Sequence, residues 1–190
     1  MNKKILVEVS ARHIHLTQID FEKLYGKGKT LIPLSKLSQP GEFASQQTIT
    51  LLNGKNKIEN VRILGPFRKN SQVEISLTDA YKLKLNPLPS IRVSGDLNNT
   101  TKITTKGPKG NVKIPVIIAQ RHLHCNEKQA KELKLKNNQK ISIRILGQRE
   151  ITFHNVIVRV SNNYDLSVHL DTDEGNSVGI KGKAFGNIIK

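Results

Sequence analysis

Two histidine pairs of the form His-x-His have the residue type and spacing for chemistry: His13 with His15, and His122 with His124. Each pair follows a β-like run, and residues two apart on a strand project from the same face. Both imidazoles of a pair can therefore reach one ion, and imidazole nitrogen suits zinc. The alternative is a polar strand end whose histidines satisfy backbone groups. Two copies, each directly behind an arginine, favour metal binding.

Strand alternation also indicates the missing ligands. Glu74 and His169 each lie on the polar face of a predicted strand whose other face is aliphatic. Either residue alone would be interpreted as an ordinary solvent-facing position. Together with the pairs they complete two sets of three, His13, His15 and Glu74, and His122, His124 and His169. Three protein ligands leave an open coordination position, which is typical of a catalytic zinc.

Arg68 is the candidate for binding an anion beside such a metal. It lies in the turn at residues 65–70, just before the strand that carries Glu74. A guanidinium in that turn can bind two oxygens of a phosphate at once. Without Glu74 nearby, we would interpret Arg68 as an ordinary surface arginine.

The metal-binding pattern is part of an internal repeat. The segment 11–17 recurs as segment 120–126, shifted by 109 positions, and both copies follow a β run and precede a helix N-cap. A repeated unit of strand, Arg-His-x-His and capped helix indicates duplication.

The elements that must position these residues are mostly strands. Period-2 alternation predicts strands at 5–9, 47–52, 61–64, 72–77, 90–93, 113–119, 140–145, 151–160 and 164–170. Three short helices are predicted, from a capping box at Thr17–Asp20 to about Tyr25, from Thr78 to about Leu83, and from Asn126 to about Leu133. Such helices are too short to cover a parallel sheet. The expected fold class is all-β with short capping helices, as β-barrels.

Composition excludes several classes of protein. The 190 residues include 31 Lys+Arg against 15 Asp+Glu, a formal charge of +16, but the lysines are scattered and aromatic residues are few. We interpret the charge as a biased surface rather than a nucleic-acid footprint. One cysteine, Cys125, excludes a disulfide framework, and we expect it to be a small packed residue. No apolar run approaches a membrane span, so a soluble intracellular protein with no membrane partner is expected.

The sequence resembles the PduL-type phosphotransacylases, the phosphate propanoyltransferases. The resemblance is collinear from about residue 4 to 181. It rests on the blocks at 9–16, 37–44, 60–68, 72–76, 94–96, 120–124 and 169–176. It implies two β-barrel domains, one formed by residues 1–11 and 120–190 and the other by residues 12–119, with the active site between them. It also implies two zinc ions per chain and interconversion of acyl-CoA plus phosphate with acyl phosphate plus CoA.

The resemblance assigns roles to individual residues. The metal ligands fall on the same two sets of three, and the catalytic, phosphate-binding arginine falls on Arg68. Coenzyme A contacts fall on Val9, Ser10, Ala11, Lys55, Arg62 and Asn176. One departure is visible, because Gly175 and Ser177 flank Asn176 where the family pattern has alanines.

The resemblance also implies a mechanism, direct attack of a CoA thiolate on the acyl carbonyl of acetyl or propanoyl phosphate. Two other enzyme or binding classes stay open on the residues alone, a metal-dependent hydrolase and a basic β-barrel that binds nucleic acid; a structural shell protein is a third alternative. A homodimer is also considered. Family members addressed to microcompartments carry an N-terminal extension, whereas the first motif here begins by residue 9, so a cytoplasmic location is expected.

Overall fold

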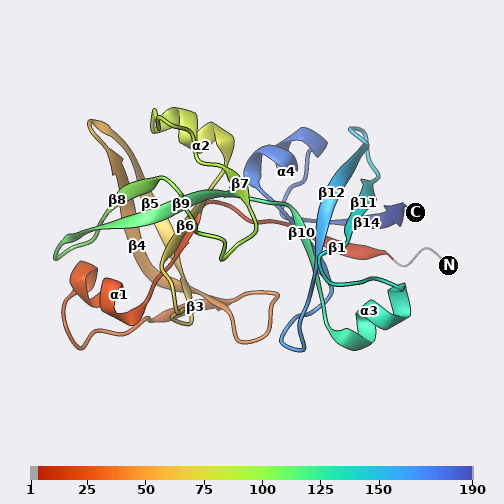
Figure 1. The fold of residues 1–190 in the computed structure, drawn as a ribbon, viewed down its shortest axis with the longest axis horizontal. Helices are drawn as coiled ribbons and strands as arrows, with labels where there is room; N and C mark the ends of the chain where they lie inside the picture. The colour runs from red at the N-terminus through yellow and green to blue at the C-terminus, as the bar shows by residue number, and fades with distance from the viewer. Residues whose placement is uncertain (1–3, 190) are drawn as a thin grey trace. The chain divides into compact units, whose positions relative to one another are not determined.

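The structure, a computed structural model, describes residues 4–189, which form mainly strands with short helices between them (Figure 1). The chain divides into two compact units. The central unit is Arg12–Ala119, and the terminal unit combines Met1–Ala11 with Gln120–Lys190.

The central unit is a closed barrel. Its strands follow the order β4-β5-β2-β6-β9-β8, and β8 pairs back onto β4; β3 and β7 extend the sheet beside β4 and β9. The elements are β2 (His13–His15), α1 (Gln18–Tyr25), β3 (Pro33–Lys36), β4 (Phe43–Asn53), β5 (Asn56–Gly65), β6 (Gln72–Ile75), α2 (Leu77–Lys82), β7 (Ile91–Arg92), β8 (Lys102–Lys106) and β9 (Asn111–Ala119).

The terminal unit is a second closed barrel, with the strand order β1-β13-β10-β12-β11-β14. Its elements are β1 (Ile5–Val9), β10 (His122–Cys125), α3 (Glu127–Leu133), β11 (Lys140–Ile145), β12 (Ile151–Val160), β13 (Ser167–Leu170), α4 (Thr172–Val178) and β14 (Lys183–Ile189). The predicted fold class, two β-barrels with short helices, is confirmed.

The two barrels repeat each other strand for strand, which is what duplication predicts. In each barrel, the His-x-His strand lies between a parallel and an antiparallel neighbour: β2 between β5 and β6, and β10 between β12 and β13. The strand that precedes each His-x-His strand in the chain pairs in the other barrel, because β1 joins β13 whereas β9 joins β6. The two repeats thus exchange their first strands, which explains why the terminal unit is discontinuous.

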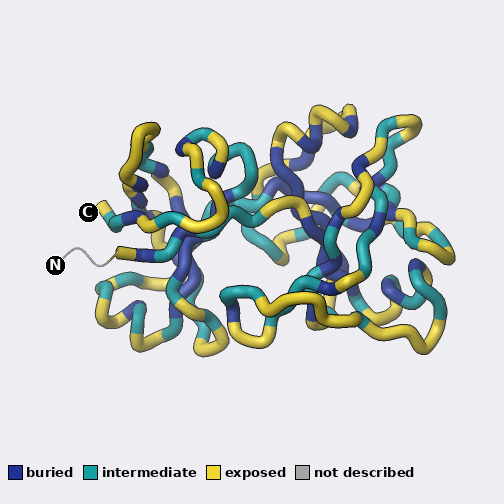
Figure 2. The backbone as a smooth tube through the Cα atoms, turned by 180° about the vertical axis from the view of Figure 1, so that it is seen from behind, coloured by how far each residue is buried: buried dark blue, intermediate teal, exposed yellow. Residues whose placement is uncertain are grey.

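Each barrel has its own apolar core, seen as the dark-blue segments of the tube in Figure 2. The cores come from strand alternation that shifts at one irregularity in each long strand: on β5 the buried hydrophobic residues are Ile58, Val61 and Ile63, and on β12 they are Phe153, Val156 and Val158. Each such side chain contributes roughly 1.5–3 kcal/mol by leaving water. This burial leaves the intervening positions free for polar side chains.

The helices begin at side chains that cap their first turns. Thr17 Oγ1 accepts the Asp20 N–H at 3.1 Å, as predicted, but the Asp20 carboxylate does not complete a capping box. Instead it accepts a hydrogen bond from Ser71 at 2.7 Å, and Ser71 Oγ accepts the Thr17 N–H at 2.9 Å. The hydroxyl of Ser71 therefore relays the second half of the cap from another part of the barrel.

Several elements are absent from the predicted ranges: the strands β2, β3, β8, β10 and β14, and the helix α4. The predicted strand at 72–77 is shorter than expected, because Ser76 leaves β6 to cap α2. Among the described residues, no helix is long and apolar enough to cross a membrane.

Candidate metal and substrate site

The central unit brings His13, His15 and Glu74 together, and we refer to these residues as the central triad. The two histidines share one face of β2, while Ile14 between them belongs to the apolar core. Antiparallel pairing of β2 with β6 places His13 directly opposite Glu74. The local reason is simple, because a three-residue strand with His at both ends can present both rings only on one face.

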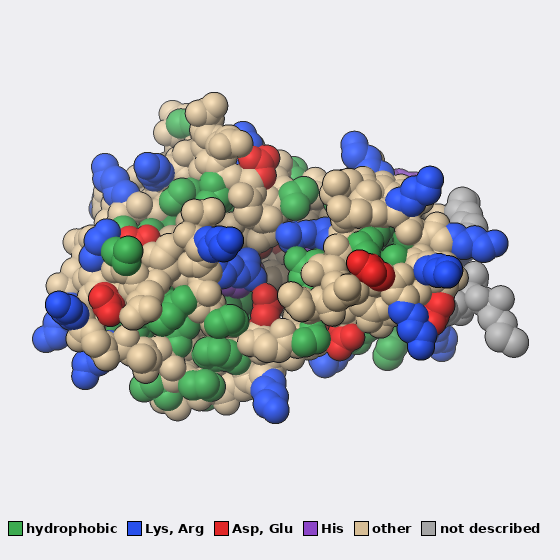
Figure 3. All heavy atoms as spheres, turned by 60° about the horizontal axis from the view of Figure 1, so that its bottom comes forward, with side chains coloured by type: hydrophobic (Ala, Val, Ile, Leu, Met, Phe, Trp, Pro, Cys, Tyr) green, Lys and Arg blue, Asp and Glu red, His purple; other side chains and the backbone are tan. Residues whose placement is uncertain are grey.

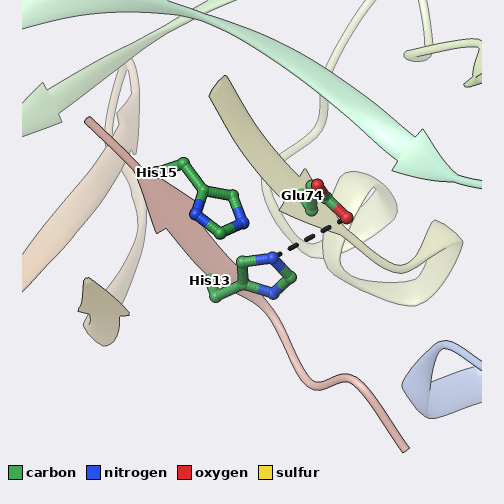
Figure 4. Close-up of side chains that lie close together, drawn as sticks. All are labelled: His13, His15 and Glu74. Atoms are coloured by element: carbon green, nitrogen blue, oxygen red, sulfur yellow. Dashed lines mark ion pairs between the residues drawn. The ribbon is translucent and has the colours of Figure 1, made fainter. Parts of the chain in front are cut away.

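The ligand atoms of the central triad converge, as Figure 4 shows. One nitrogen of each histidine and one oxygen of Glu74 all lie within 4.8 Å of one another. His13 Nε2 is 3.7 Å from Glu74 Oε2, and the two imidazole rings meet edge to face with centroids 4.9 Å apart. All three side chains are buried. Two imidazoles and one carboxylate are a ligand set suited to zinc with an open position.

His15 provides the clearest sign that the central triad fits a metal. Its Nδ1 atom is buried and meets no hydrogen-bond partner among the described residues. Burial, followed by the positive potential of His13 and Arg68, lowers the pKa of His15 well below its usual range. The ring is therefore neutral at pH 7, and a neutral imidazole is the form that binds a metal ion. A buried polar atom without a partner is otherwise costly.

Glu74 is held by a polar network that the sequence did not reveal. Ser94 Oγ donates to Glu74 Oε1 at 2.7 Å, and the side-chain amide of Gln72 donates to the same oxygen. The amide oxygen of Gln72 accepts the Gly95 N–H at 2.9 Å. These bonds occupy Oε1 and leave Oε2 toward His13. Outer partners of this kind orient metal ligands.

The terminal unit gathers His122, His124 and His169, which we refer to as the terminal triad. Antiparallel pairing of β10 with β13 places His122 opposite His169. The centroids of the three rings lie 4.5, 4.9 and 5.1 Å apart. Within residues 4–189, however, the central triad is the one group of three such side chains whose ligand atoms converge on one point.

Neighbours fix the rings of the terminal triad. His122 Nδ1 lies 2.9 Å from the backbone oxygen of Gln120, an acceptor, so Nδ1 donates this hydrogen bond and the ring is oriented by it. His169 Nε2 lies 2.8 Å from the hydroxyl of Ser167. Tyr164 stacks on His124 with centroids 3.9 Å apart. Tyr164 and Ser167 were not predicted as part of the site.

Arg68 lies close to the central triad. Its backbone N–H donates to the carbonyl of Leu16 at 2.9 Å, one residue beyond β2. Its guanidinium is near enough to lower the pKa of His15, and Arg68 Nη2 donates to Glu42 Oε1 at 2.8 Å. The ion pair is only partly buried, with exposed fractions of 36% for Arg68 and 28% for Glu42. Arg68 is thus an accessible cation whose present partner is a carboxylate.

The residues to which the resemblance assigns CoA contacts are spread over both units. Val9 is the last residue of β1, and Ser10 and Ala11 follow it. The Ser10 N–H donates to Leu170 O at 2.7 Å, and Asn176 lies on α4 of the same unit. Arg62 lies opposite His13 on β5 and donates to two backbone carbonyls of β4, those of Ser45 and Gln46. Lys55 is exposed in the β4–β5 hairpin turn, seven residues along the strand from Arg62, which is roughly 20 Å. The structure therefore does not bring Lys55 to the triad.

Gly175, where the family pattern has alanine, packs closely on Val9. A Cβ atom on Gly175 would lie 2.4 Å from Val9 Cγ2. We expect Gly175→Ala to lower the free energy of unfolding by about 1–3 kcal/mol through overpacking, despite the roughly 1 kcal/mol that alanine gains in a helix. Chemical denaturation of the variant beside Ser177→Ala tests this. A stabilised Gly175→Ala protein would contradict the close packing.

The charged side chains can be followed on one face of the molecule. On the face seen in Figure 3, Lys and Arg side chains are scattered and acidic side chains lie among them. Several cations are paired, for example Arg144 with Glu150 and Lys57 with Glu59. This arrangement carries no argument for nucleic acid.

Two closed barrels, one with a buried and converging His-His-Glu triad beside an accessible arginine, define the class of protein as a two-barrel candidate metalloenzyme. The family model for phosphate propanoyltransferase matches residues 6–181. Similar curated proteins include phosphate propanoyltransferases of Thermotoga maritima, Clostridioides difficile and Priestia megaterium. The first is 43% identical over 176 residues, covering 91% of this chain and 83% of that protein. The second is 39% identical, covering 98% and 89%, and the third is 45% identical, covering 89% and 78%.

The chain belongs to the phosphate propanoyltransferase family. It is therefore an enzyme, a phosphate acyltransferase, and the resemblance drawn from the sequence blocks is confirmed.

Proposed function

We propose that the enzyme interconverts acyl-CoA plus phosphate with acyl phosphate plus CoA, with acetyl or propanoyl as the acyl group. The observation that carries the proposal is the converging central triad beside Arg68, in a chain of this family. The buried Nδ1 of His15, which has no hydrogen-bond partner within the described residues, supports metal binding at this triad.

The proposed metal is zinc, two ions per chain acting as one dinuclear centre. His13, His15 and Glu74 would hold one ion, and His122, His124 and His169 the other. Bound zinc supplies Lewis-acid chemistry, which stabilises a thiolate and polarises a carbonyl oxygen. The ring neutrality of His15 and the protonated Nδ1 of His122 prepare both ligands for this role.

Arg68 is the proposed phosphate-binding and catalytic residue. Charge-assisted hydrogen bonds from a guanidinium hold two oxygens of a phosphate in a defined orientation. In the forward reaction Arg68 would hold phosphate for attack on the thioester, and in reverse it would stabilise the leaving phosphate. CoA is proposed to contact Val9, Ser10, Ala11, Lys55, Arg62 and Asn176.

The chemical step is proposed to be direct transfer. The CoA thiolate attacks the acyl carbonyl carbon of the acyl phosphate, and a C–S bond forms. The bond between that carbon and the oxygen that bridges it to phosphorus breaks. Phosphate departs with the electron pair of this C–O bond. The protein contributes no acyl-carrying nucleophile, since its one cysteine is Cys125. Cys125 is buried in the terminal core, and burial raises the pKa of its thiol.

Replacing Cys125 with alanine is therefore expected to leave kcat within about threefold of wild type, while core packing loses roughly 1 kcal/mol. Initial rates of acyl phosphate formation, with thermal unfolding in parallel, measure both effects. A loss of activity with retained folding would argue for an acyl-cysteine intermediate instead.

The experiment that tests the function follows both products. Zinc-loaded protein is incubated with propanoyl-CoA, with and without phosphate; free CoA is measured with a thiol reagent and acyl phosphate is trapped as the hydroxamate. We expect equal amounts of CoA and hydroxamate, and only with phosphate present. CoA release without phosphate would instead identify a hydrolase.

A further inference from the structure

Each metal-binding strand is preceded by an arginine that meets a carboxylate. Arg12 precedes His13, and its Nε donates to both carboxylate oxygens of Asp79 at 2.9 Å. Arg121 precedes His122, and its Nε lies 3.1 Å from Glu174 Oε1. The two ion pairs thus occupy the same place in the two repeats.

The carboxylates are themselves fixed by the helices that carry them. Asp79 is the third residue of α2 and forms a capping box with Ser76; Glu174 is the third residue of α4 and forms a capping box with Asp171. Asp79 has an exposed fraction of only 2%. In a capping box the carboxylate accepts a hydrogen bond from the backbone of the N-cap residue, whose side chain in turn accepts one from the backbone of the carboxylate residue. Each carboxylate therefore has little freedom to move.

Each ion pair lies at the end of an antiparallel strand pair that carries candidate ligands, β2 with β6 or β10 with β13. Asp79 follows Glu74 by five residues, and Glu174 follows His169 by five residues. Glu74 pairs across the ribbon with His13, and His169 pairs with His122. A bond from the residue before the first ligand to the helix after the third ligand therefore ties both ligand strands together one step from the metal positions.

We propose that Arg12–Asp79 and Arg121–Glu174 are two copies of one positioning device, which holds the His-x-His strand of each barrel in register with the strand of its third ligand. The inference rests on the proposed metal function and adds four residues to it. They act through the ligands and touch neither metal nor substrate.

The strand exchange explains why such a device is needed. Each arginine stands where the chain has just left one barrel, after β1 or β9, and begins the ligand strand of the other. β2 is only three residues long, so few ladder hydrogen bonds fix its start. A planar guanidinium held by a fixed carboxylate restricts the strand at this first residue.

The two copies differ in strength. Arg12 Nε donates to both oxygens of a deeply buried carboxylate, whereas Arg121 Nε lies 3.1 Å from one oxygen of Glu174 but makes no hydrogen bond within residues 4–189. The Arg121 guanidinium also lies 5.4 Å from the centroid of the Phe153 ring. Asp171 and Asp173 are acidic neighbours of Glu174, and burial raises the pKa of Glu174. Loss of the Arg12 pair is therefore expected to have the larger effect.

The test measures metal affinity one triad at a time in the full chain. In a His122→Ala/His124→Ala background only the central triad can bind, and in a His13→Ala/His15→Ala background only the terminal triad can. Cobalt(II) titration followed by visible absorption, and zinc competition against a chromophoric chelator, then measure each triad separately. Arg12→Gln and Arg121→Gln are placed in both backgrounds, so that each variant is the control for the other.

We expect Arg12→Gln to weaken metal binding about 10- to 100-fold in the central triad and to alter the cobalt spectrum, since partners of ligands have effects of this size. Arg121→Gln should do so, to a smaller extent, only in the terminal triad. Arg12→Lys keeps the charge without the fork and should fall between wild type and Arg12→Gln. Adding Asp79→Asn to Arg12→Gln should lower the metal affinity little further, because the arginine and the carboxylate act as one pair.

Three outcomes decide the matter. The reciprocal loss just described supports the device. Unchanged affinity and spectrum in Arg12→Gln and Arg12→Lys, with only a lowered melting temperature, would overturn it and assign the pairs a purely structural role. Absence of cobalt and zinc binding by both backgrounds and by the wild-type chain would refute the proposed metal function as well, so the two failures are distinguishable.

Discussion

Replacing His15 with leucine is expected to lower the rate of acyl transfer by more than about 100-fold, because the loss of a ligand exceeds the 10- to 100-fold effect of a ligand's outer partner. The same change should leave the metal-free protein about as stable as wild type. Leucine fills a similar volume and removes a buried Nδ1 that has no hydrogen-bond partner in the described chain, which offsets the loss of the ring's hydrogen bond with the Leu64 backbone. A large loss of activity is thus predicted without a comparable loss of stability.

A pH dependence accompanies this prediction. Burial lowers the pKa of His15 in the folded protein, so below the ordinary histidine value of about 6.5 the unfolded chain binds more protons than the folded one. The stability of metal-free wild type should therefore fall as the pH drops from 7 toward 5, beyond the fall seen in His15→Leu. Urea denaturation at several pH values measures the difference.

His154 supplies the matched control for His15. It is an exposed histidine on β12, and its Nδ1 lies 2.8 Å from the hydroxyl of Ser142. His154→Leu should keep both the activity and the stabilisation by zinc. If His15→Leu still bound two zinc ions per chain, the central triad would not be a metal site.

Replacing Arg68 with alanine is expected to reduce kcat/KM for phosphate by about 10- to 100-fold, which corresponds to the roughly 1.5–3 kcal/mol of hydrogen bonds to a charged group. Arg68→Lys should recover only part of this loss, because an ammonium cannot hold two phosphate oxygens in a planar fork. The KM for CoA should change little in either variant. Initial-rate kinetics in both directions provide these constants.

Glu42→Gln provides a comparison of opposite sign. The carboxylate of Glu42 accepts a hydrogen bond from Arg68 at 2.8 Å, so it competes with phosphate for the same guanidinium. Removing its charge should lower the KM for phosphate a few fold. An Arg68→Ala enzyme with an unchanged KM and kcat for phosphate would remove Arg68 from the site, whatever Glu42→Gln does.

The strands that carry Glu74 and His169 could be predicted from the sequence because strand alternation is a local property. The parity of Glu74 and His169 within their strands needs no knowledge of the partner strands. The repeat of the Arg-His-x-His segment is equally visible in one dimension, and it indicated the duplication before any pairing was known.

The contacts that orient the ligands depend on pairing between distant segments, and the sequence pattern does not reveal them. Ser94 reaches Glu74 from a loop twenty residues further along the chain, and Asp79 meets Arg12 from a helix 67 residues further along. The exchange of β1 and β9 between the barrels likewise depends on which strands pair, and strand alternation does not predict the partners. Glycines also weakened the local signals for two elements, because glycine is unfavourable in both helices and strands. α4 contains Gly175, and β14 contains Gly186, where a Cβ atom would lie 2.8 Å from Ile143 Cγ2.

The most direct test of the account is the formation of acyl phosphate from propanoyl-CoA and phosphate before chelation, after chelation and after zinc is returned. The account predicts full dependence on phosphate, loss of activity when zinc is removed, and recovery as about two zinc ions bind per chain. It also predicts no recovery in His15→Leu. Undiminished transfer by protein shown to be free of metal would contradict it.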